Sequence, residues 1–365
     1  MTPPLATTKL QANARSQEGV IVGLAATASE MIATKREPDF ISAVNRLRDL
    51  TNDDLEAVNS EILGRMQSPV SMIPELAGHL IKAGGKRLRP MLTLASARLF
   101  GYSASDHIKL AAAVELIHGA TLLHDDVVDD SALRRGASTA NIIWGNKESV
   151  LVGDFIFSRA FELMVEAKDL RVLKVLSHAS SVIAEGEVLQ LTTQKNVAAT
   201  FETYLNVVHA KTAALFAAAS EVGVLIAGRT EKEEAAMHRF GDNFGVAYQL
   251  IDDALDYAGF ENALGKTVGD DFREGKMTAP VVFAIAAARD EEKPFWNRVI
   301  GEGQQKDGDF EQACELMVRD GAITKTLECA QEYAQKAVDA LDEAPKNEFS
   351  DALQELVVTS TARGA

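Results

Sequence analysis

The sequence predicts an all-α protein built as one large helical bundle. Apolar residues recur at helical spacing in successive runs, and Gly or Pro residues separate these runs. The chain contains no alternating Val- and Ile-rich runs and no asparagine-glycine pairs, so it predicts neither strands nor tight hairpins. With 365 residues and 47% apolar content, it is long enough to bury a large core. Length alone also allows two domains, but the repeated helical runs favour a single bundle.

The composition argues against several classes of protein. A formal net charge of −16 disfavours nucleic-acid binding and docking on an anionic membrane surface. The two cysteines, Cys314 and Cys329, form no disulfide framework and are typical of a reducing compartment, so we expect a cytoplasmic location. The longest apolar stretch, Thr212–Gly228, contains Glu221 and is too short for a membrane span. It predicts a buried helix, and we expect no transmembrane segment.

The N-terminal part is predicted to precede the folded domain. Residues 1–37 are rich in Ala, Thr, Ser and Gln and do not resemble a signal peptide. We expect a flexible extension here, followed by an all-helical domain over residues 38–365. The first helical run extends from Phe40 to Arg65, and a second covers Met72–Ala83 before a pair of glycines.

A basic loop follows, with the sequence GGKRLRP at 84–90. Lys86, Arg87 and Arg89 present three cations just before the helix that Pro90 opens. Basic side chains at the start of a helix form an anion site, because the backbone N–H groups and the helix dipole point toward the same place. A solvated surface turn is the alternative for this loop taken alone.

The rest of the chain is organised around the helix predicted over Asp106–Asp129. A stretch with one formal charge, Ala111–His124, leads into Asp125, Asp126 and Asp129. Residues four apart share a helix face, so Asp125 and Asp129 are neighbours, and Asp126 is rotated by about 100° from Asp125 but can lean toward the same ion. Carboxylates clustered at a helix C-terminus oppose its dipole, and a cation compensates them. Carboxylates combined with substrate phosphates suit Mg²⁺.

Two arginines and a second aspartate cluster extend this pattern. Arg134 and Arg135 follow within two turns, and their planar forks match phosphate geometry. A second D-D-x-x-D stands at Asp252, Asp253 and Asp256, on another apolar helix. A single acidic triplet is more often a solvated surface. Two copies on apolar helices can face each other and hold Mg²⁺ ions around one diphosphate.

The later segments show fewer signals. Helices are predicted over Trp144–Glu166 and Leu170–Glu187, and a third, rich in small residues, begins at Lys211 and Thr212. A lysine in such a position most often extends to solvent. The segment GKTVGDDFREGKMTAP at 265–280 is a strongly charged loop, which is normally solvated. The C-terminal part beyond it is polar and helical and shows no recognisable chemistry.

Together these motifs resemble those of the trans-type polyprenyl diphosphate synthases of the isoprenoid synthase family, in particular the long-chain octaprenyl and decaprenyl type. The resemblance rests on GGKRLRP, the two aspartate motifs, Lys211-Thr212 and residues 265–280, in the family's order. It implies the isoprenoid synthase type I fold, a helical bundle around a central cavity. It also implies a Mg²⁺-dependent homodimeric prenyltransferase, with three ions per site, that adds isopentenyl diphosphate to an allylic diphosphate.

The resemblance implies a role for each motif residue. The implied Mg²⁺ ligands are Asp125, Asp126, Asp129, Asp252, Asp253 and Asp256. The implied ligands of the isopentenyl diphosphate are Lys86, Arg89, His118 and Arg135. Those of the allylic diphosphate are Arg134, Lys211, Thr212, Gln249, Lys266 and Lys276. The expected catalytic residues are Asp125, Asp126, Asp129, Lys211, Asp252 and Asp253. Gly186, Glu187 and Gln190 resemble a G-E-x-x-Q element of the family.

Small residues on the first aspartate helix predict the length of the product. Thr121 and Ala120 lie four and five residues before Asp125, where bulky aromatic side chains block the tunnel of short-chain relatives. Their small size, and a helix about 36 Å long, predict a product of roughly C40 to C50 in the range of quinone side chains. Phe161 or Met164 is a candidate for the floor of the tunnel.

Other functions share parts of this pattern. Glu115 and His118 have the E-x-x-H spacing of carboxylate di-iron bundles, but Glu234 and His238 are four apart and form no second pair. A class I terpene cyclase shares an aspartate-rich helix but does not need GGKRLRP for a second diphosphate. A noncatalytic subunit of a heteromeric synthase is expected to have lost aspartates, and both motifs are whole. A farnesyl or geranylgeranyl diphosphate synthase is the alternative for product length.

Overall fold

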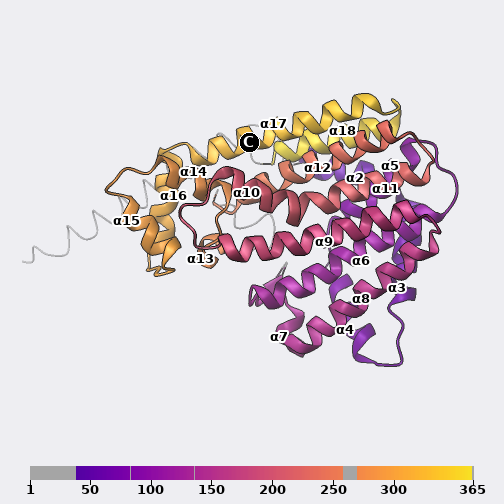
Figure 1. Ribbon diagram of the computed structural model, residues 1–365, viewed down its shortest axis with the longest axis horizontal. Coiled ribbons are helices and arrows are strands. Elements are labelled where there is room, and N and C mark those ends of the chain that lie inside the picture. The colour runs from indigo at the N-terminus through magenta and orange to yellow at the C-terminus, as the bar shows by residue number, and fades with distance from the viewer. Residues whose placement is uncertain (1–37, 83, 135, 258–268, 364–365) are drawn as a thin grey trace, which may run out of the picture.

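The computed structural model describes residues 38–82, 84–134, 136–257 and 269–363. In these residues the regular structure is helical apart from one pair of two-residue strands, which confirms the predicted all-α bundle (Figure 1). The predictions made for residues 1–37, for Arg135 and for Lys266 lie outside the described residues.

The helices occupy runs close to those predicted. In chain order they are α2 (Pro38–Leu50), α3 (Asn52–Arg65), α4 (Met72–Lys82), α5 (Leu88–Leu99), α6 (Asp106–Val128), α7 (Ala140–Trp144), α8 (Asn146–Glu166), α9 (Leu170–Thr193), α10 (Phe201–Val208), α11 (Ala214–Ile226), α12 (Glu231–Leu255), α13 (Asp270–Glu274), α14 (Ala279–Ala287), α15 (Lys293–Trp296), α16 (Asp309–Arg319), α17 (Ala322–Ala340) and α18 (Glu348–Thr361). Two π turns, His209–Ala213 and Asn297–Gly301, and a 3₁₀ turn, Leu341–Glu343, join some of them.

The helix α6 lies at the centre of the bundle, in contact with α3, α5, α8 and α11. Its middle part, Ala111–Val114, is fully buried, because a helix that is apolar on all sides must be covered on all sides. Small side chains there let the neighbouring helices approach closely. The helix ends at Asp129, whose backbone N–H donates to the carbonyl of Asp125 at 2.8 Å. The carboxylates therefore stand where the buried helix reaches the open end of the bundle.

The small-residue helix does not begin at Lys211 as the sequence predicted. Instead α10, the π turn His209–Ala213 and α11 form one helical run, with Lys211 and Thr212 in its middle. The run Phe201–Ile226 is long and apolar enough to cross a membrane by length and composition, but 67% of its apolar window is buried inside the bundle. A core helix passes the same test, and the buried-helix prediction agrees with this packing.

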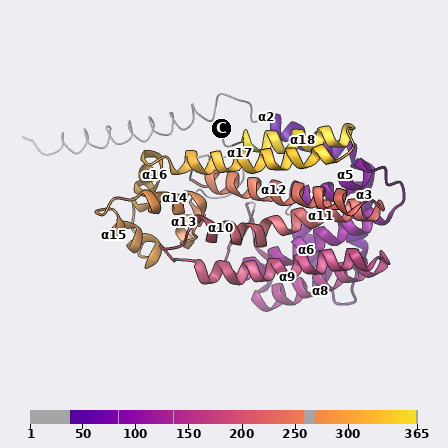
Figure 2. The same ribbon diagram turned by 45° about the horizontal axis from the view of Figure 1, so that its top comes forward.

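The C-terminal helices cover one side of the bundle. Figure 2 shows α17 and α18 as an outer layer over α12, which itself packs on α11. The helix α18 also packs against α2 and α5, so the two ends of the described chain lie together. Short helices α13 to α16 form a second apolar cluster around Phe272 and Trp296 at one end of the molecule (Figure 1).

A short hairpin follows the first aspartate motif. Strands β1 (Leu133–Arg134) and β2 (Ala137–Ser138) pair antiparallel, although the sequence predicted neither strands nor hairpins. The hydroxyl of Thr139 donates to the carbonyl of Ser131 at 2.6 Å and closes the base of the hairpin. The hairpin places Arg134 beside the end of α6.

Candidate active site

Both aspartate motifs line one cavity of about 900 Å³. Asp125 and Asp129 enter it from the end of α6, and Asp252, Asp253 and Asp256 enter it from the end of α12. The predicted convergence of the two carboxylate sets is therefore present in the structure. The cavity is also lined by basic side chains from five other segments, so its mouth is strongly charged.

The three carboxylates of the first motif have different surroundings. Asp125 and Asp129 face the cavity, whereas Asp126 is 2% exposed and is not part of its wall. The Arg134 guanidinium donates to the Asp126 carboxylate at 2.7 and 2.8 Å, and Arg134 itself does line the cavity. Burial raises the pKa of Asp126, and the bonds from Arg134 partly offset that rise. In this structure Asp126 orients an arginine instead of facing the predicted metal site.

Each carboxylate of the second motif has different partners. Asp252 forms an ion pair with Arg363, near the C-terminus. Asp253 is 2% exposed and accepts hydrogen bonds from the Tyr204 hydroxyl at 2.6 Å and from the Gln249 amide at 2.7 Å.

The third carboxylate of that motif, Asp256, binds the backbone. It accepts from the N–H groups of Gly269 at 3.2 Å and Asp271 at 3.1 Å, and so fixes the start of α13 against the end of α12.

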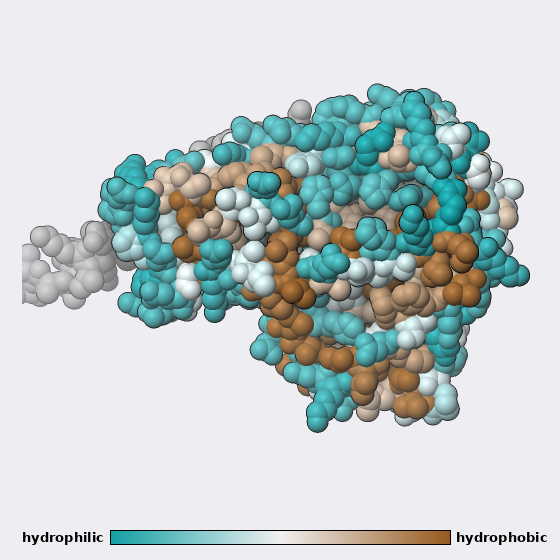
Figure 3. All heavy atoms as spheres, in the orientation of Figure 1, coloured by the Kyte–Doolittle hydropathy of each residue, from teal (hydrophilic) through white to brown (hydrophobic). Residues whose placement is uncertain are grey.

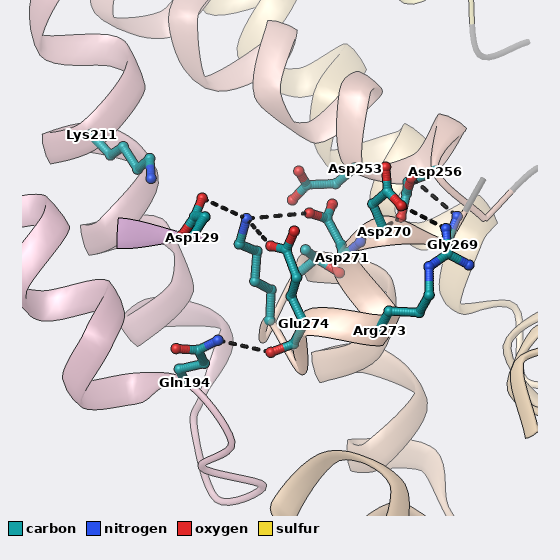
Figure 4. A network of polar contacts seen from close by, with 12 residues as sticks. Asp129, Gln194, Lys211, Asp253, Asp256, Gly269, Asp270, Asp271, Arg273 and Glu274 are labelled. Atoms are coloured by element: carbon teal, nitrogen blue, oxygen red, sulfur yellow. Dashed lines mark hydrogen bonds and ion pairs between the residues drawn. The ribbon is translucent and has the colours of Figure 1, made fainter. Parts of the chain in front are cut away.

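Lys276 links the two motifs. Its ammonium lies 3.2 Å from the Asp129 carboxylate, pairs with Glu274, and lies 3.9 Å from Asp271. Figure 4 shows Asp129 facing Asp271 and Glu274 across the cavity, with Asp253 nearby. Burial lowers the pKa of Lys276, but the surrounding carboxylates outweigh burial and raise it. The lysine therefore stays charged between the two acidic walls of the cavity, one formed by Asp125 and Asp129 and the other by Asp252, Asp253 and Asp256.

The π turn contributes the next pair of predicted residues. The Lys211 ammonium donates to the Glu187 carboxylate of α9 at 2.7 Å. The Thr212 hydroxyl donates to the Gln249 amide oxygen of α12 at 2.9 Å. All four side chains line the cavity, as predicted for Lys211, Thr212 and Gln249. The π turn is therefore hydrogen-bonded to α9 through Glu187 and to α12 through Gln249.

A separate basic group occupies the wall formed by α5 and α6. Lys86 and Arg89 line the cavity with His118, and one guanidinium nitrogen of Arg89 lies 3.2 Å from the His118 ring nitrogen. The guanidinium of Arg89 also lies over the Phe216 ring, 4.5 Å from its centroid. The third cation of the basic loop, Arg87, forms an ion pair with Glu115. Lys86, Arg89 and His118, which were predicted to bind isopentenyl diphosphate, thus line the same cavity.

Arg363 joins this group, and sequence reasoning missed it. Its guanidinium lies 4.7 Å from the Phe40 ring centroid and 4.9 Å from that of Tyr248, while the Lys86 ammonium lies 5.0 Å from Phe40. Burial lowers the pKa of Arg363, but Asp252 and Tyr248 together outweigh burial and raise the pKa, so the side chain stays charged. A single arginine after a polar helix carries no local signal. Only the packing of α18 on α2 brings it to the cavity.

The inner part of the cavity is apolar. Thr121 lines it, as predicted, but Ala120 is 1% exposed in the core and does not border it. Phe161 and Met164, predicted as a floor, pack in the core elsewhere. The apolar wall is formed instead by residues from α3, α4, α6 and α8 (Ile62, Met66, Ala77, Ile81, Leu116 and Ile156). The cavity therefore continues from the charged mouth along α6.

Two carboxyls, the half-buried Asp125 and the buried Asp253, both have a raised pKa. Burial raises the pKa of Asp125 to about 7, Lys211 partly offsets this, and the neighbouring Glu187 and Asp129 add to it. Burial likewise raises the pKa of Asp253 to about 7, together with the charge of Asp271. Carboxyls held away from water among other carboxylates favour a bound cation, because the cation replaces the proton. Carboxylate oxygens are the donors that Mg²⁺ prefers, but among the described residues no group of three or more acidic, histidine or cysteine side chains forms an ion site by itself, so substrate phosphates would complete the coordination.

The raised pKa of Asp125 predicts a pH effect on stability without metal. Relative to an Asp125→Asn variant, the metal-free protein should lose stability as the pH rises from about 4 to about 7. In this pH range Asp125 is protonated in the folded state but ionised in the unfolded chain. Proton binding therefore favours the folded state at pH 4, and this contribution to the free energy of unfolding is lost as the pH rises toward 7. Melting temperatures of both proteins with chelator should diverge toward pH 7. A difference that does not change with pH would contradict the prediction.

Comparisons with known proteins agree with this geometry. A family model described as polyprenyl synthetase matches residues 70–317. The octaprenyl diphosphate synthase of Escherichia coli (strain K12) is 43% identical over 85% of this chain and 96% of that protein. The corresponding enzyme of Haemophilus influenzae is 38% identical over 90% of this chain and 99% of that protein.

Solved structures have the same fold. A polyprenyl synthase from Caulobacter crescentus CB15, complexed with calcium and isoprenyl diphosphate, matches with a TM-score of 0.85 and 52% identity, covering 88% of this chain and 98% of that one. A decaprenyl diphosphate synthase from Rhodobacter capsulatus matches with a TM-score of 0.85 and 50% identity, covering 88% and 99%. The chain belongs to the polyprenyl synthetase family, and it is a Mg²⁺-dependent trans-prenyltransferase of isoprenoid biosynthesis.

Proposed function

We propose that this enzyme adds isopentenyl diphosphate repeatedly to an allylic diphosphate and releases an all-trans polyprenyl diphosphate of roughly C40 to C50, a precursor of quinone side chains. The observation that carries the proposal is the cavity itself. Two acidic walls and two basic groups surround its mouth, and its inner part is apolar. One mouth can thus hold two diphosphates while the growing chain lies in the apolar part.

The acidic walls would hold Mg²⁺. Asp125 and Asp129 on one side and Asp252 on the other are the direct ligands in this proposal, with Asp253 and Asp256 as supporting groups. Magnesium commonly binds one or two carboxylates and completes its coordination with water and substrate phosphate oxygens. The two walls would together hold the three ions that the family resemblance implies. Bound Mg²⁺ supplies Lewis-acid stabilisation of the departing pyrophosphate.

The chain's own cations would bind the allylic diphosphate beside the metal. Arg134, held by Asp126, and Lys211, held by Glu187, both line the cavity, and the charge of each lowers the pKa of Asp125. Lys276 can exchange its carboxylate partners for phosphate oxygens. These positive groups stabilise the charge that develops as the carbon–oxygen bond breaks. Lys266 is assigned to the same diphosphate by the resemblance of its motif.

The second basic group would hold isopentenyl diphosphate. Lys86, Arg89 and His118 lie together on the α5–α6 wall, and Arg363 lies beside them. Arg135 belongs to this set by resemblance. The double bond of isopentenyl diphosphate would attack the allylic cation, and proton loss to the released pyrophosphate would regenerate an allylic diphosphate that is five carbons longer. The Thr212 hydroxyl and the Gln249 amide, which are hydrogen-bonded to each other, belong by resemblance to the allylic diphosphate.

The apolar part of the cavity supports a long product. Each buried CH₂ group contributes up to about 0.8 kcal/mol, so side chains such as Met66 and Leu116 can retain an elongating intermediate. Two octaprenyl and one decaprenyl diphosphate synthase match at 38%, 43% and 50% identity, whereas three geranylgeranyl pyrophosphate synthases of known structure match at 32%, 31% and 27%. Both lines of support favour a long-chain enzyme over a farnesyl or geranylgeranyl diphosphate synthase.

One assay tests the function directly. Purified protein with Mg²⁺, farnesyl diphosphate and labelled isopentenyl diphosphate should give products of roughly C40 to C50 by mass spectrometry. No incorporation of label would point to a terpene cyclase, and products that stop at about C15 to C20 to a short-chain synthase. Iron in the purified protein would revive the di-iron alternative, although Glu115 and Glu234 each form an ion pair with an arginine.

A homodimer in the cytoplasm is part of this proposal. Large apolar side chains on the hairpin, α7 and α8 are exposed, and Figure 3 shows apolar surface over α7 and α8. They include Leu133 at 64%, Ile142 at 58% and Leu151 at 67% exposed. A contiguous apolar patch marks a protein interface, and a second copy is the partner that the family resemblance implies. The two cysteines are unpaired, as in a reducing compartment.

A further inference from the structure

The π turn His209–Ala213 keeps one face of a long helical run on the cavity. Tyr204, Val208, Thr212 and Phe216 all line it, at intervals of four residues. In a regular α-helix each such interval rotates about 40° beyond a full turn, so Phe216 would stand about 120° away from Tyr204. The π turn closes an i→i+5 bond from the Ala214 N–H to the His209 carbonyl and absorbs about 100° of that rotation. Without it, Phe216 would be turned farthest from the cavity, about 120° from Tyr204.

A π turn is wider than an α turn, and two glycines make room for it. A Cβ atom built on Gly186 of α9 would lie 2.7 Å from the Ala210 Cβ and 2.8 Å from the Lys211 backbone nitrogen. A Cβ atom built on Gly245 of α12 would lie 2.6 Å from the Ala213 Cα. Both distances are too short for real carbon atoms. Each flanking helix thus carries a glycine, which is less favourable than alanine inside a helix, at the point where the turn touches it.

The same two helices also orient the side chains of the turn. One residue after Gly186, the Glu187 carboxylate accepts from Lys211. One helical turn after Gly245, the Gln249 amide accepts from Thr212 and donates to Asp253. On each helix, the glycine that leaves space for the π turn therefore lies within one helical turn of the side chain that hydrogen-bonds to Lys211 or Thr212. A shift of either backbone moves both.

We propose that Gly186 and Gly245 are positioning residues of the active site. They admit the π turn between α9 and α12, and the turn presents Lys211 and Thr212 to the allylic diphosphate. Neither glycine touches substrate; each acts through the turn. The role of Lys211 and Thr212 rests on the proposed function, whereas the packing of the turn does not.

The test is Gly186→Ala in the full-length protein. The new methyl group should push the turn away from α9 and displace the Lys211 ammonium from Glu187. We expect kcat to fall about 10- to 100-fold and the KM for the allylic substrate to rise, with the KM for isopentenyl diphosphate within about twofold, because a displacement near 1 Å can cost that much. Gly245→Ala should likewise lower kcat and raise the KM for the allylic substrate more than the KM for isopentenyl diphosphate.

Gly223→Ala is the matched control. A Cβ atom there would lie 2.5 Å from the Thr93 carbonyl oxygen of α5, an equally severe clash, but at the opposite end of α11. It should lower the melting temperature as Gly186→Ala does and leave the allylic KM unchanged. The double variant Gly186→Ala, Ala210→Gly removes the contact between the two Cβ atoms but not that with the Lys211 nitrogen, so it should recover part of kcat.

Three outcomes would overturn the proposal. The first is a Gly186→Ala variant with unchanged kcat and unchanged KM for the allylic substrate. The second is a loss of kcat/KM that is equal for both substrates and the same in Gly186→Ala and Gly223→Ala. The third is a crystal structure of Gly186→Ala in which the π turn and its Lys211–Glu187 contact are intact. If the alanine variants do not fold, Glu187→Gln removes the orienting charge without a clash and should raise the allylic KM selectively; equal effects on both substrates would count against the idea. If wild-type enzyme incorporates no isopentenyl diphosphate, the proposed function fails, and the crystal structure still tests the turn.

Discussion

Replacing Asp125 by alanine is expected to abolish condensation, with kcat at least about 10³-fold lower. Asp125 lies at the meeting point of the site, near Asp129, Lys211 and Glu187, and its carboxylate is a direct Mg²⁺ ligand in the proposed function. Asp125→Asn keeps the shape of the side chain and removes only its charge, so it should lose nearly as much. Product formation from labelled isopentenyl diphosphate is the measurement.

Asp130→Asn is the control for this experiment. Asp130 is exposed, belongs to the same acidic run and is not part of the cavity wall. Its φ of 49° is tolerated by asparagine, so the substitution introduces no backbone strain. It should leave kcat unchanged. Near-normal turnover in Asp125→Ala, with the melting temperature retained, would refute the assignment of the acidic walls to metal.

Replacing Thr121 by phenylalanine should shorten the product, from roughly C40–C50 to about C20 or less. Thr121 lines the cavity one turn before Asp125, and its hydroxyl donates to the His118 carbonyl at 2.8 Å. An aromatic ring there would fill the passage between the charged mouth and the apolar inner part. Mass spectrometry of the products measures the effect. Thr121→Val, which conserves volume, should give the wild-type length.

Ala120→Phe is the companion to this variant. The sequence assigns the same effect to both positions, but in the structure Ala120 packs in the core and only Thr121 borders the cavity. The pair therefore decides whether the growing chain passes one face of α6 or two. Because Ala120 is surrounded by core side chains, phenylalanine there should also destabilise the fold by about 1–3 kcal/mol. An unchanged product in Thr121→Phe would count against the tunnel.

Local sequence patterns were sufficient for much of this protein. The i, i+4 spacing of Asp125 and Asp129 and the apolar run before them place the carboxylates at the end of a buried helix, and the structure has them there. The basic loop before α5 was also predictable, because the glycines and Pro90 mark the start of a helix. Such features depend on residues within two helical turns of one another.

Contacts between distant segments were not predictable in the same way. Nothing near Asp126 indicates that it pairs with Arg134 across a hairpin, and the place of Arg363 beside Asp252 depends on how α18 packs against α2. The π turn around Lys211 was predicted as the start of a helix. The wider turn fits because Gly186 of α9 and Gly245 of α12 leave space for it. These glycines lie on other helices, so the sequence around Lys211 contains no pattern that indicates the π turn.

The amino-acid sequence alone established the all-α class, both aspartate motifs, the basic loop and the family, since each follows from spacing along one helix or one loop. Tertiary packing decided which carboxylates face the cavity, which cation balances each of them, and which side of α6 the product touches. These depend on the direction in which each side chain leaves its helix relative to its neighbours. A rotation of one residue, about 100°, is enough to move a side chain from cavity to core, as Ala120 and Thr121 show.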